Sequence, residues 1–270
     1  MLNVTVTDRS KRYVSDLIED DFRVFEDGRP QQITFFQPQA LPLALVLLLD
    51  TSASMSGALW DAQKAAIRLI GELGPADVAS VIAFDTSVRV LQPFTNDKQL
   101  LESAIRQTRL GRKTALYTAL YVALKDVSRI AAKTDGDEPR RRALVVLSDG
   151  TDTSSPVAFQ DLLDLAVRTD AAIYCIGLHL PEPDPGVIDD GRLVLRRLAQ
   201  QTGGRAFFPA QPEYLSEIYG DITRELSSQY AVAYVSNNPR TDGRFRQIKV
   251  HVGRPGIVAR TKPGYFAPTR

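Results

Sequence analysis

The side chains best suited to chemistry follow an uninterrupted apolar stretch. Residues 43–49 are all apolar, and Asp50, Ser52 and Ser54 come next at alternate positions. Together they offer one carboxylate and two hydroxyls, which are hard oxygen donors. Such donors suit Mg²⁺, Mn²⁺ or Ca²⁺ and suit Zn²⁺ or copper poorly. This stretch therefore predicts a site for a hard divalent cation.

Two later loops carry oxygen donors in comparable positions. Thr114 opens a helix predicted at about 114–132, and Asp149 follows an apolar strand predicted at 143–147. Sites in open α/β sheets form at the carboxyl ends of the strands, so all three loops would lie on one edge of a doubly wound sheet. Together the three loops offer several oxygen donors, among them Asp50, Ser52, Ser54, Thr114 and Asp149. Taken singly, the hydroxyls could be helix N-caps and Asp149 a turn residue.

The elements that must position these loops alternate between strand and helix. We predict strands at 43–50, 77–84, 143–147, 171–178 and 205–208, with an antiparallel edge strand at 87–91. Helices are predicted at about 57–73, 100–105, 114–132, 157–169, 191–201 and 212–228. Continuous apolar runs are typical of strands buried on both faces. The fold class expected is therefore α/β, with a doubly wound, mostly parallel sheet.

Both ends of the chain have a different pattern. Residues 2–37 alternate in the manner of β-strands, and Asp27-Gly28-Arg29-Pro30 separates runs at 22–26 and 31–36, which predicts a hairpin. Alternation returns after Gln229. We expect the segments 1–40 and 229–270 to pair into a small antiparallel, sandwich-like subdomain beside a central domain at 41–228. The alternative is that they extend the edge of the central sheet.

Composition excludes several classes of function. The net charge of +1 over 270 residues gives no reason to expect nucleic acid or an anionic membrane as a partner. The only cysteine, Cys175, lies in an apolar run and is expected to be a buried, inert thiol. His179 and His251 are far apart with no cysteine nearby, which disfavours a histidine-based metal site. No stretch has the roughly 20 apolar residues that a membrane span requires. Met1 runs straight into an expected strand with no signal peptide in the sequence, so we expect either a cytoplasmic protein or a mature segment with an added start codon.

Two charged segments have ordinary explanations as well as functional ones. Arg140-Arg141-Arg142 could bind an anion, but we expect a solvated entry to the strand that follows. The loop at 181–191, with Asp184, Asp189 and Asp190, follows a core strand on the same edge as the predicted metal site. It could shape the choice of partner, and a variable solvated loop is the simpler interpretation.

The donor pattern resembles a known family. Asp50-x-Ser52-x-Ser54, with Thr114 and Asp149 later in the chain, is similar to the metal-ion-dependent adhesion site of von Willebrand factor type A domains. The resemblance covers roughly 41–228. The ends resemble the flanking β segments of a bacterial subgroup, at 21–28, 228–230 and 262–266. Proteins of that subgroup are usually exported, so an exported location is expected, with a cytoplasmic one as the alternative.

The resemblance also implies roles for the residues. Ser52, Ser54 and Thr114 would coordinate Mg²⁺ directly, whereas Asp50 and Asp149 would act through bound waters or as supporting partners. One coordination position would stay open for an Asp or Glu carboxylate of a partner protein. We therefore expect a non-enzymatic, Mg²⁺-dependent (or Mn²⁺- or Ca²⁺-dependent) adhesion or protein-binding module. The sequence leaves its oligomeric state open.

Two other functions compete with this one. The first is a Mg²⁺-dependent phosphohydrolase or phosphotransferase that uses Asp50 as its nucleophile. Haloacid-dehalogenase-like enzymes place a second Asp two residues after the nucleophile, and Ser52 occupies that position here. Phosphate-binding loops of the GxxxxGK[ST] and GxGxxG types are absent from the sequence. The second is a structural domain whose ion has no ligand.

Overall fold

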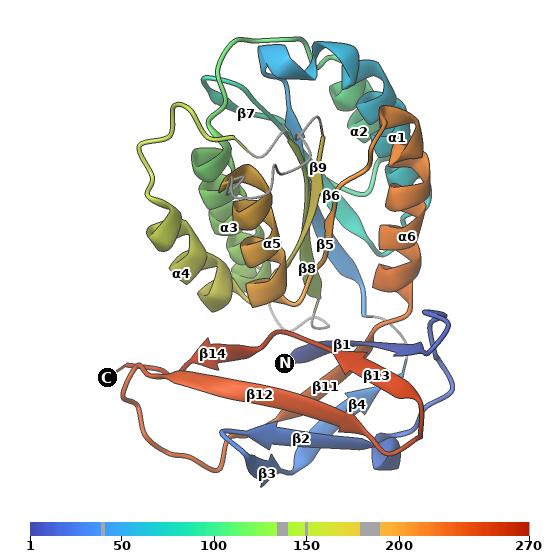
Figure 1. Cartoon of the computed structure of the whole chain (residues 1–270), viewed down its shortest axis with the longest axis vertical. Coiled ribbons are helices and arrows are strands. Elements are labelled where there is room, and N and C mark those ends of the chain that lie inside the picture. The colour runs from blue at the N-terminus through green and yellow to red at the C-terminus, as the bar shows by residue number, and fades with distance from the viewer. Residues whose placement is uncertain (39–40, 134–139, 149–150, 179–189, 270) are drawn as a thin grey trace, which may run out of the picture.

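The protein is a helix-flanked sheet that stands on a smaller all-β part, and both chain ends lie in the all-β part (Figure 1). The computed structural model describes residues 1–38, 41–133, 140–148, 151–178 and 190–269. Its mostly parallel central sheet with additional antiparallel sheets confirms the predicted fold class. The division at residues 40 and 228 stays our interpretation.

The central sheet has six strands in the order β10-β9-β8-β5-β6-β7. They are β5 (Leu43–Asp50), β6 (Val78–Phe84), β7 (Val88–Thr95), β8 (Arg141–Ser148), β9 (Ala172–Gly177) and β10 (Ala206–Phe207). Only β6 and β7 pair antiparallel, as predicted for the edge strand. The chain passes from β5 to β6 on one side and later returns to β8 on the other. The strand order therefore reverses beside β5, where doubly wound sheets form their sites.

Helices cover both faces of the sheet because β5 is apolar on both faces. Leu45 and Leu47 belong to the core under one set of helices, and Val46 and Leu48 to the core under the other. The first set is α1 (Leu59–Gly71), α2 (Lys98–Arg106) and α6 (Leu215–Ser227), and the second is α3 (Leu116–Lys133), α4 (Phe159–Thr169) and α5 (Asp190–Thr202). Each predicted helix is present, with small shifts at its ends. None of the helices in the described ranges has the length and apolar character needed to cross a bilayer.

The two chain ends pair with each other in the all-β part. One sheet has the order β13-β1-β11-β4 and the other the order β14-β12-β2-β3. Their strands are β1 (Leu2–Asp8), β2 (Phe22–Glu26), β3 (Arg29–Gln31), β4 (Ile33–Gln37), β11 (Tyr230–Tyr234), β12 (Phe245–Val252), β13 (Ile257–Arg260) and β14 (Gly264–Phe266). Val4, Phe22 and Tyr230 contribute to the apolar core that these strands share. Strands from opposite ends of the sequence thus bury one core.

The predicted hairpin is present, but one of its strands is shorter than expected. Asp27 and Gly28 have φ values of 47° and 78°, as a two-residue type I′ turn requires. They connect β2 to β3, so the paired strand is Arg29–Gln31 rather than 31–36. The following residues, Ile33–Gln37, form β4 and pair with β11 in the other sheet. The turn is encoded locally, whereas the partner of β4 depends on a strand almost 200 residues away.

The arginine run at the start of β8 is not the uniformly solvated strand entry that we expected. Arg141 is only 5% exposed. Its Nε donates to the carbonyl of Leu41 at 2.6 Å, and an Nη donates to Oε1 of Gln229 at 3.1 Å. Burial lowers its pKa to about 10. The all-β part covers this end of the central sheet, and the guanidinium satisfies backbone and amide acceptors there.

Cys175 has the environment that its apolar neighbours indicated. Its side chain is fully buried in β9 and is a free thiol. Burial raises its pKa far above the usual range for a thiol. Because the thiolate is the reactive form, this cysteine has a packing role.

Candidate metal centre

Asp50 is the last residue of β5 and lies at the point where the strand order reverses. The residue is 1% exposed. Its Oδ1 accepts a hydrogen bond from the backbone N–H of Ser52 at 2.8 Å, and its Oδ2 accepts one from the hydroxyl of Ser148 at 2.6 Å. Ser148 ends the neighbouring strand β8. The carboxylate therefore joins the ends of two adjacent parallel strands.

The chain turns sharply after Asp50, so that the next two serines lie side by side. The hydroxyl oxygens of Ser52 and Ser54 are 2.9 Å apart. A short 3₁₀ helix (Ala53–Gly57) begins directly after Ser52, but the Ser52 side chain makes no capping hydrogen bond to it. This argues against the N-cap alternative for Ser52, because its hydroxyl faces Ser54 instead.

The loop before α3 is held against the first loop by backbone hydrogen bonds. The N–H of Gly111 donates to the carbonyl of Thr51 at 2.6 Å, and the N–H of Ala53 donates to the carbonyl of Arg112 at 3.2 Å. Gly111 must lack a side chain, because a Cβ there would lie 2.2 Å from Oδ2 of Asp85. This close approach places Thr114 near the Asp50 loop.

Asp85 organises the loop after β6. It is 9% exposed, and its Oδ1 accepts hydrogen bonds from the backbone N–H and the hydroxyl of Ser87. Its Oδ2 pairs with Arg89 at 2.9 Å, and its carbonyl accepts from the N–H of Ala115 at 2.7 Å. Asp85 therefore fixes both the β6 loop and the start of α3.

Thr114 is not the N-cap of α3, because residues from the loop after β8 cap that helix. The N–H of Tyr117 donates to Oδ1 of Asp152 at 3.1 Å, and the N–H of Thr118 donates to the hydroxyl of Ser155 at 3.0 Å. The N–H of Thr114 itself donates to the Thr153 hydroxyl at 3.0 Å. α3 begins two residues later than predicted, which leaves Thr114 in the preceding loop.

The structure thus brings together the loops that hold four of the five predicted ligands. Loop 50–54 bonds to loop 111–114, which in turn bonds to residues 153–154. Asp149, the fifth predicted ligand, lies outside the described residues, although its neighbour Ser148 bonds directly to Asp50. Most of the loop at 181–191, including Asp184 and Asp189, also lies outside them.

Sequence reasoning did not assign a role to three residues of this site. Ser148 supports Asp50, Asp85 supports the Gly111 loop and Asp152 caps α3. Each lies at or just beyond the carboxyl end of a core strand, and this position is the feature of the sequence that could have indicated a role in the site. Their partners are distant in sequence, so the pattern of the chain did not show which group each would contact.

The chemistry of the site comes from hydroxyls as much as from carboxylates. Among the described residues, no three His, Cys, Asp or Glu side chains gather as a metal-binding group. The predicted donor set of two serines, one threonine and few carboxylates offers mainly hard oxygen ligands. The donors present therefore fit Mg²⁺ or Mn²⁺.

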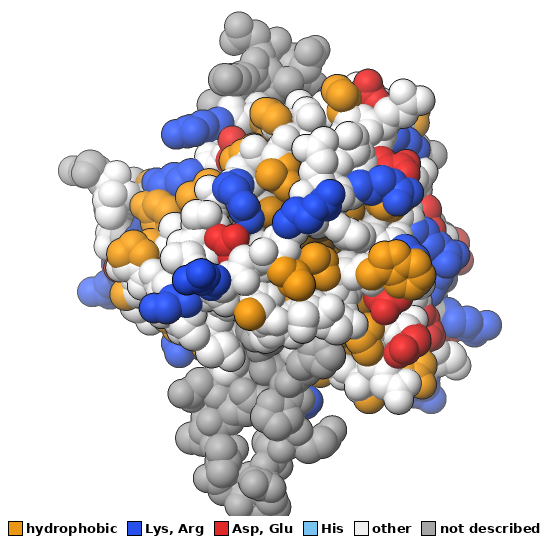
Figure 2. Space-filling model, turned by 90° about the horizontal axis from the view of Figure 1, so that it is seen from above, with side chains coloured by type: hydrophobic (Ala, Val, Ile, Leu, Met, Phe, Trp, Pro, Cys, Tyr) orange, Lys and Arg blue, Asp and Glu red, His pale blue; other side chains and the backbone are white. Residues whose placement is uncertain are grey.

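The surface around the site is basic. Arg109, Arg112 and Lys113 are exposed and have no acidic partner within the described part of the chain. Viewed onto this end of the molecule, lysine and arginine side chains form a band across the face (Figure 2). Elsewhere many exposed cations are paired, for example Arg106 with Glu102 at 2.7 Å.

Comparison with known proteins shows what the central sheet is similar to. Residues 45–151 match the model of the von Willebrand factor type A domain. A UPF0353 protein of Mycolicibacterium vanbaalenii is 25% identical over 202 residues, which cover 67% of this chain and 60% of that protein. The chain therefore spans about 60% of the length of this relative. The family match confirms the resemblance found in the sequence.

Two solved structures show the same fold at low identity. A von Willebrand factor type A protein from Catenulispora acidiphila has a TM-score of 0.60 and 13% identity, and the match covers 93% of this chain and 74% of that one. Proximal thread matrix protein 1 from the mussel byssus, with a zinc-occupied MIDAS motif, has a TM-score of 0.55 and 15% identity. That match covers 72% of this chain and 48% of the mussel protein.

Proposed function

Since this chain carries a domain with the von Willebrand factor type A fold, whose family model matches residues 45–151, we propose that it is a metal-dependent protein-binding module. One observation carries the proposal. The loops that bear Asp50, Ser52, Ser54 and Thr114 are bonded to one another where the strand order reverses. In the proposed site, these residues, which are distant in sequence, form one set of oxygen donors.

The two serine hydroxyls lie side by side, with their oxygens 2.9 Å apart in a mutual hydrogen bond. Neighbouring hydroxyls suit a hard divalent cation, and Mg²⁺ or Mn²⁺ is the ion proposed. In the proposed site the hydroxyls of Ser52, Ser54 and Thr114 hold the ion, and Asp50 and Asp149 act through water or as supporting partners.

The proposed ligand is an Asp or Glu carboxylate on a partner protein. A site built mainly from neutral hydroxyls leaves the ion strongly electrophilic, so an outside carboxylate would complete its coordination. Arg109, Arg112 and Lys113 would attract further acidic residues of the same partner. These charges support an acidic binding segment, and the near-neutral net charge of the whole chain gives no support to nucleic acid.

The geometry does not favour the phosphohydrolase alternative. A nucleophilic Asp50 would need an oxygen that can reach a phosphorus atom. Instead, both of its carboxylate oxygens accept hydrogen bonds and the residue is 1% exposed. Within the described residues, Asp50 is thus placed to support neighbouring loops.

We also propose an exported location, in line with the resemblance of the flanking β segments to those of exported bacterial proteins. A role in cell adhesion would follow only if the partner is a surface protein. Cell fractionation of the native organism checks the location, and recovery of the protein only from the cytoplasm would refute it.

Calorimetric titration of Mg²⁺ tests the metal site. The full chain should bind one ion with micromolar-to-millimolar affinity, roughly as expected of a weak oxygen-donor site. The double variant Ser52→Ala/Ser54→Ala should lose this heat. Ser56→Ala is a matched control, because Ser56 is exposed in the same segment but outside the donor pattern. Equal heats for the double variant and the wild type would refute the site.

Two further assays separate the competing functions. A pull-down from the native organism, with Mg²⁺ or with chelator, should recover a partner only with the metal. Turnover of a generic phosphate ester that Asp50→Asn abolishes would favour the enzyme instead.

A further inference from the structure

A second polar cavity lies at the opposite end of the central sheet, where the sheet meets the all-β part. Its volume is about 220 Å³, which leaves room for a small ligand. Charged and polar groups that line it include Thr7, Lys11, Tyr13, Arg205, Glu225 and Arg260.

The floor of this cavity is one face of the strand pair β1 and β13. Thr5 lies opposite Arg260, and Thr7 lies opposite Val258. Directly opposed residues of antiparallel strands project to the same face, while Val4 and Val6 project to the other face and fill the sandwich core. The β1–β13 pair therefore turns a polar face toward the central domain.

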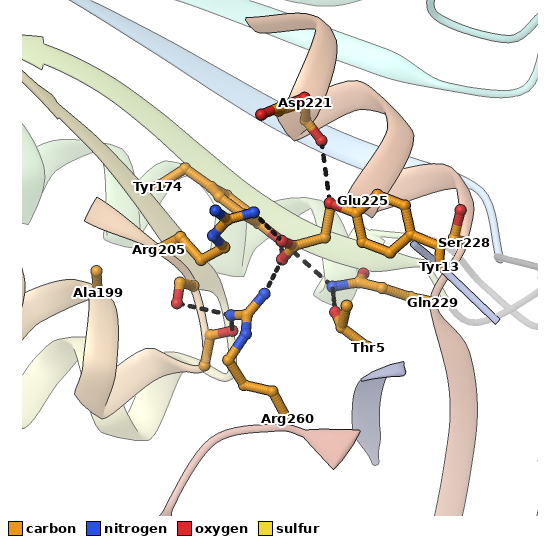
Figure 3. A network of polar contacts seen from close by, with 12 residues as sticks. Thr5, Tyr13, Tyr174, Ala199, Arg205, Asp221, Glu225, Ser228, Gln229 and Arg260 are labelled. Atoms are coloured by element: carbon orange, nitrogen blue, oxygen red, sulfur yellow. Dashed lines mark hydrogen bonds and ion pairs between the residues drawn. The ribbon is translucent and has the colours of Figure 1, made fainter. Parts of the chain in front are cut away.

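Charged groups of both parts meet at the cavity wall, with Glu225 and Arg205 from the central domain and Arg260 from β13. Glu225 of α6 is 1% exposed and accepts a hydrogen bond from the Tyr174 hydroxyl at 2.7 Å. Arg260 bonds to one of its carboxylate oxygens, and Arg205 lies 3.4 Å from the other. Figure 3 shows the two guanidinium groups converging on this single carboxylate. One negative charge thus faces two positive charges.

The loop after β1 adds a third positive charge. Lys11 is exposed and adopts a left-handed backbone conformation, with φ at 60°. Within the described ranges its ammonium group has no acidic partner. Tyr13, which forms an isolated antiparallel β-bridge with Thr7, contributes a hydroxyl. Burial and, as a smaller cause, the negative charge of Glu225 raise the pKa of Tyr13. The Tyr13 hydroxyl therefore keeps its proton at neutral pH.

From this arrangement we infer that the cavity is a binding site for a small anion that carries a phosphate or carboxylate group. Lys11 and Arg205 would contact the anion, and the Thr7 hydroxyl would supply a further hydrogen bond. The Tyr13 hydroxyl already donates to the carbonyl of Asp221 at 3.4 Å, so Tyr13 mainly shapes the cavity. Arg260 already bonds to Glu225 and to the carbonyl of Gly204, so it contributes mainly charge.

The chemistry of the lining favours an anion over a neutral ligand. Guanidinium and ammonium groups bind phosphate and carboxylate oxygens by charge-assisted hydrogen bonds, which are the strong ones. The excess of two positive charges over Glu225 has no other counterion among the described residues that line the cavity. Residues of β1, β13 and α6, together with Arg205 directly before β10, line the cavity. A bound anion would therefore also hold the all-β part against the central domain.

Calorimetric titration of the full chain with inorganic phosphate tests this site, with sulfate and succinate as parallel titrants. One anion should bind, and the best titrant tells a phosphate-type from a carboxylate-type ligand. Lys11→Glu should weaken binding by about tenfold or more, since it replaces one charge-assisted contact by repulsion. Lys125→Glu makes the same charge change at an exposed position of α3 and should have little effect. Circular dichroism confirms that both variants fold.

Chelator should leave the anion titration unchanged, which separates this site from the proposed metal centre. Equal weakening by Lys11→Glu and Lys125→Glu would overturn the inference, because it would show general charge screening. The absence of heat with all three titrants would overturn it as well.

Discussion

The buried carboxylate of Glu225 should contribute much more to stability than an exposed one with the same type of partner. Glu225→Gln keeps the shape of the side chain but removes its charge. The Tyr174 hydroxyl bond is fully buried, and a hydrogen bond to a charged group contributes about 1.5–3 kcal/mol. The ion pairs with Arg205 and Arg260 involve side chains that are 41% and 32% exposed, so each is worth at most about 0.5–1 kcal/mol.

We therefore expect Glu225→Gln to lower the free energy of unfolding by about 3 kcal/mol. For a chain of this size, that corresponds to a fall in Tm of about 6–12 °C. Glu102→Gln is the matched control, because Glu102 pairs with Arg106 at 2.7 Å but the two side chains are 42% and 65% exposed. Its change should stay within about 0.5 kcal/mol.

Differential scanning calorimetry of the two variants measures the difference directly. A double-mutant cycle with Tyr174→Phe then measures how far the charge strengthens the hydroxyl bond, because the amide oxygen of Gln can still accept it, and the coupling energy should be about 1 kcal/mol. If Glu225→Gln lowered Tm no further than Glu102→Gln does, burial would not strengthen this network and the reasoning would be refuted.

Two other predictions address the site and the core. Gly111→Ala places a Cβ 2.2 Å from Asp85 Oδ2, so it should destabilise the protein by about 1–3 kcal/mol and weaken Mg²⁺ binding. Gly57→Ala is the control, because nothing lies within 4 Å of its new Cβ, and it should have neither effect. Calorimetry with Mg²⁺ compares the two variants. Stability should also fall as the pH rises above about 10. Burial raises the pKa of four tyrosines in the folded protein, namely Tyr174, Tyr219, Tyr230 and Tyr234. The unfolded chain therefore loses its phenolic protons at lower pH than the folded protein, which favours unfolding. Urea midpoints across this pH range check the second prediction, and an unchanged midpoint would contradict it.

Local patterns in the sequence were sufficient for much of the architecture. The apolar run of β5 predicted a buried strand, since its alternate residues had to pack on both faces. Asp27 and Gly28 predicted a two-residue turn, because they tolerate positive φ. The types of the donor residues after β5 also predicted a hard-cation site, because coordination chemistry depends on the donor atoms themselves.

Other features depend on which surfaces meet in three dimensions. β4 pairs with β11, Arg141 is buried under the all-β part, and Asp152 caps α3 in place of Thr114. The contact between Ser148 and Asp50 joins residues 98 positions apart. Short-range conformational preferences act within a few residues, so they could predict elements and donor types. The partner of each buried polar group is chosen by the packing of distant segments, and only the folded chain establishes it.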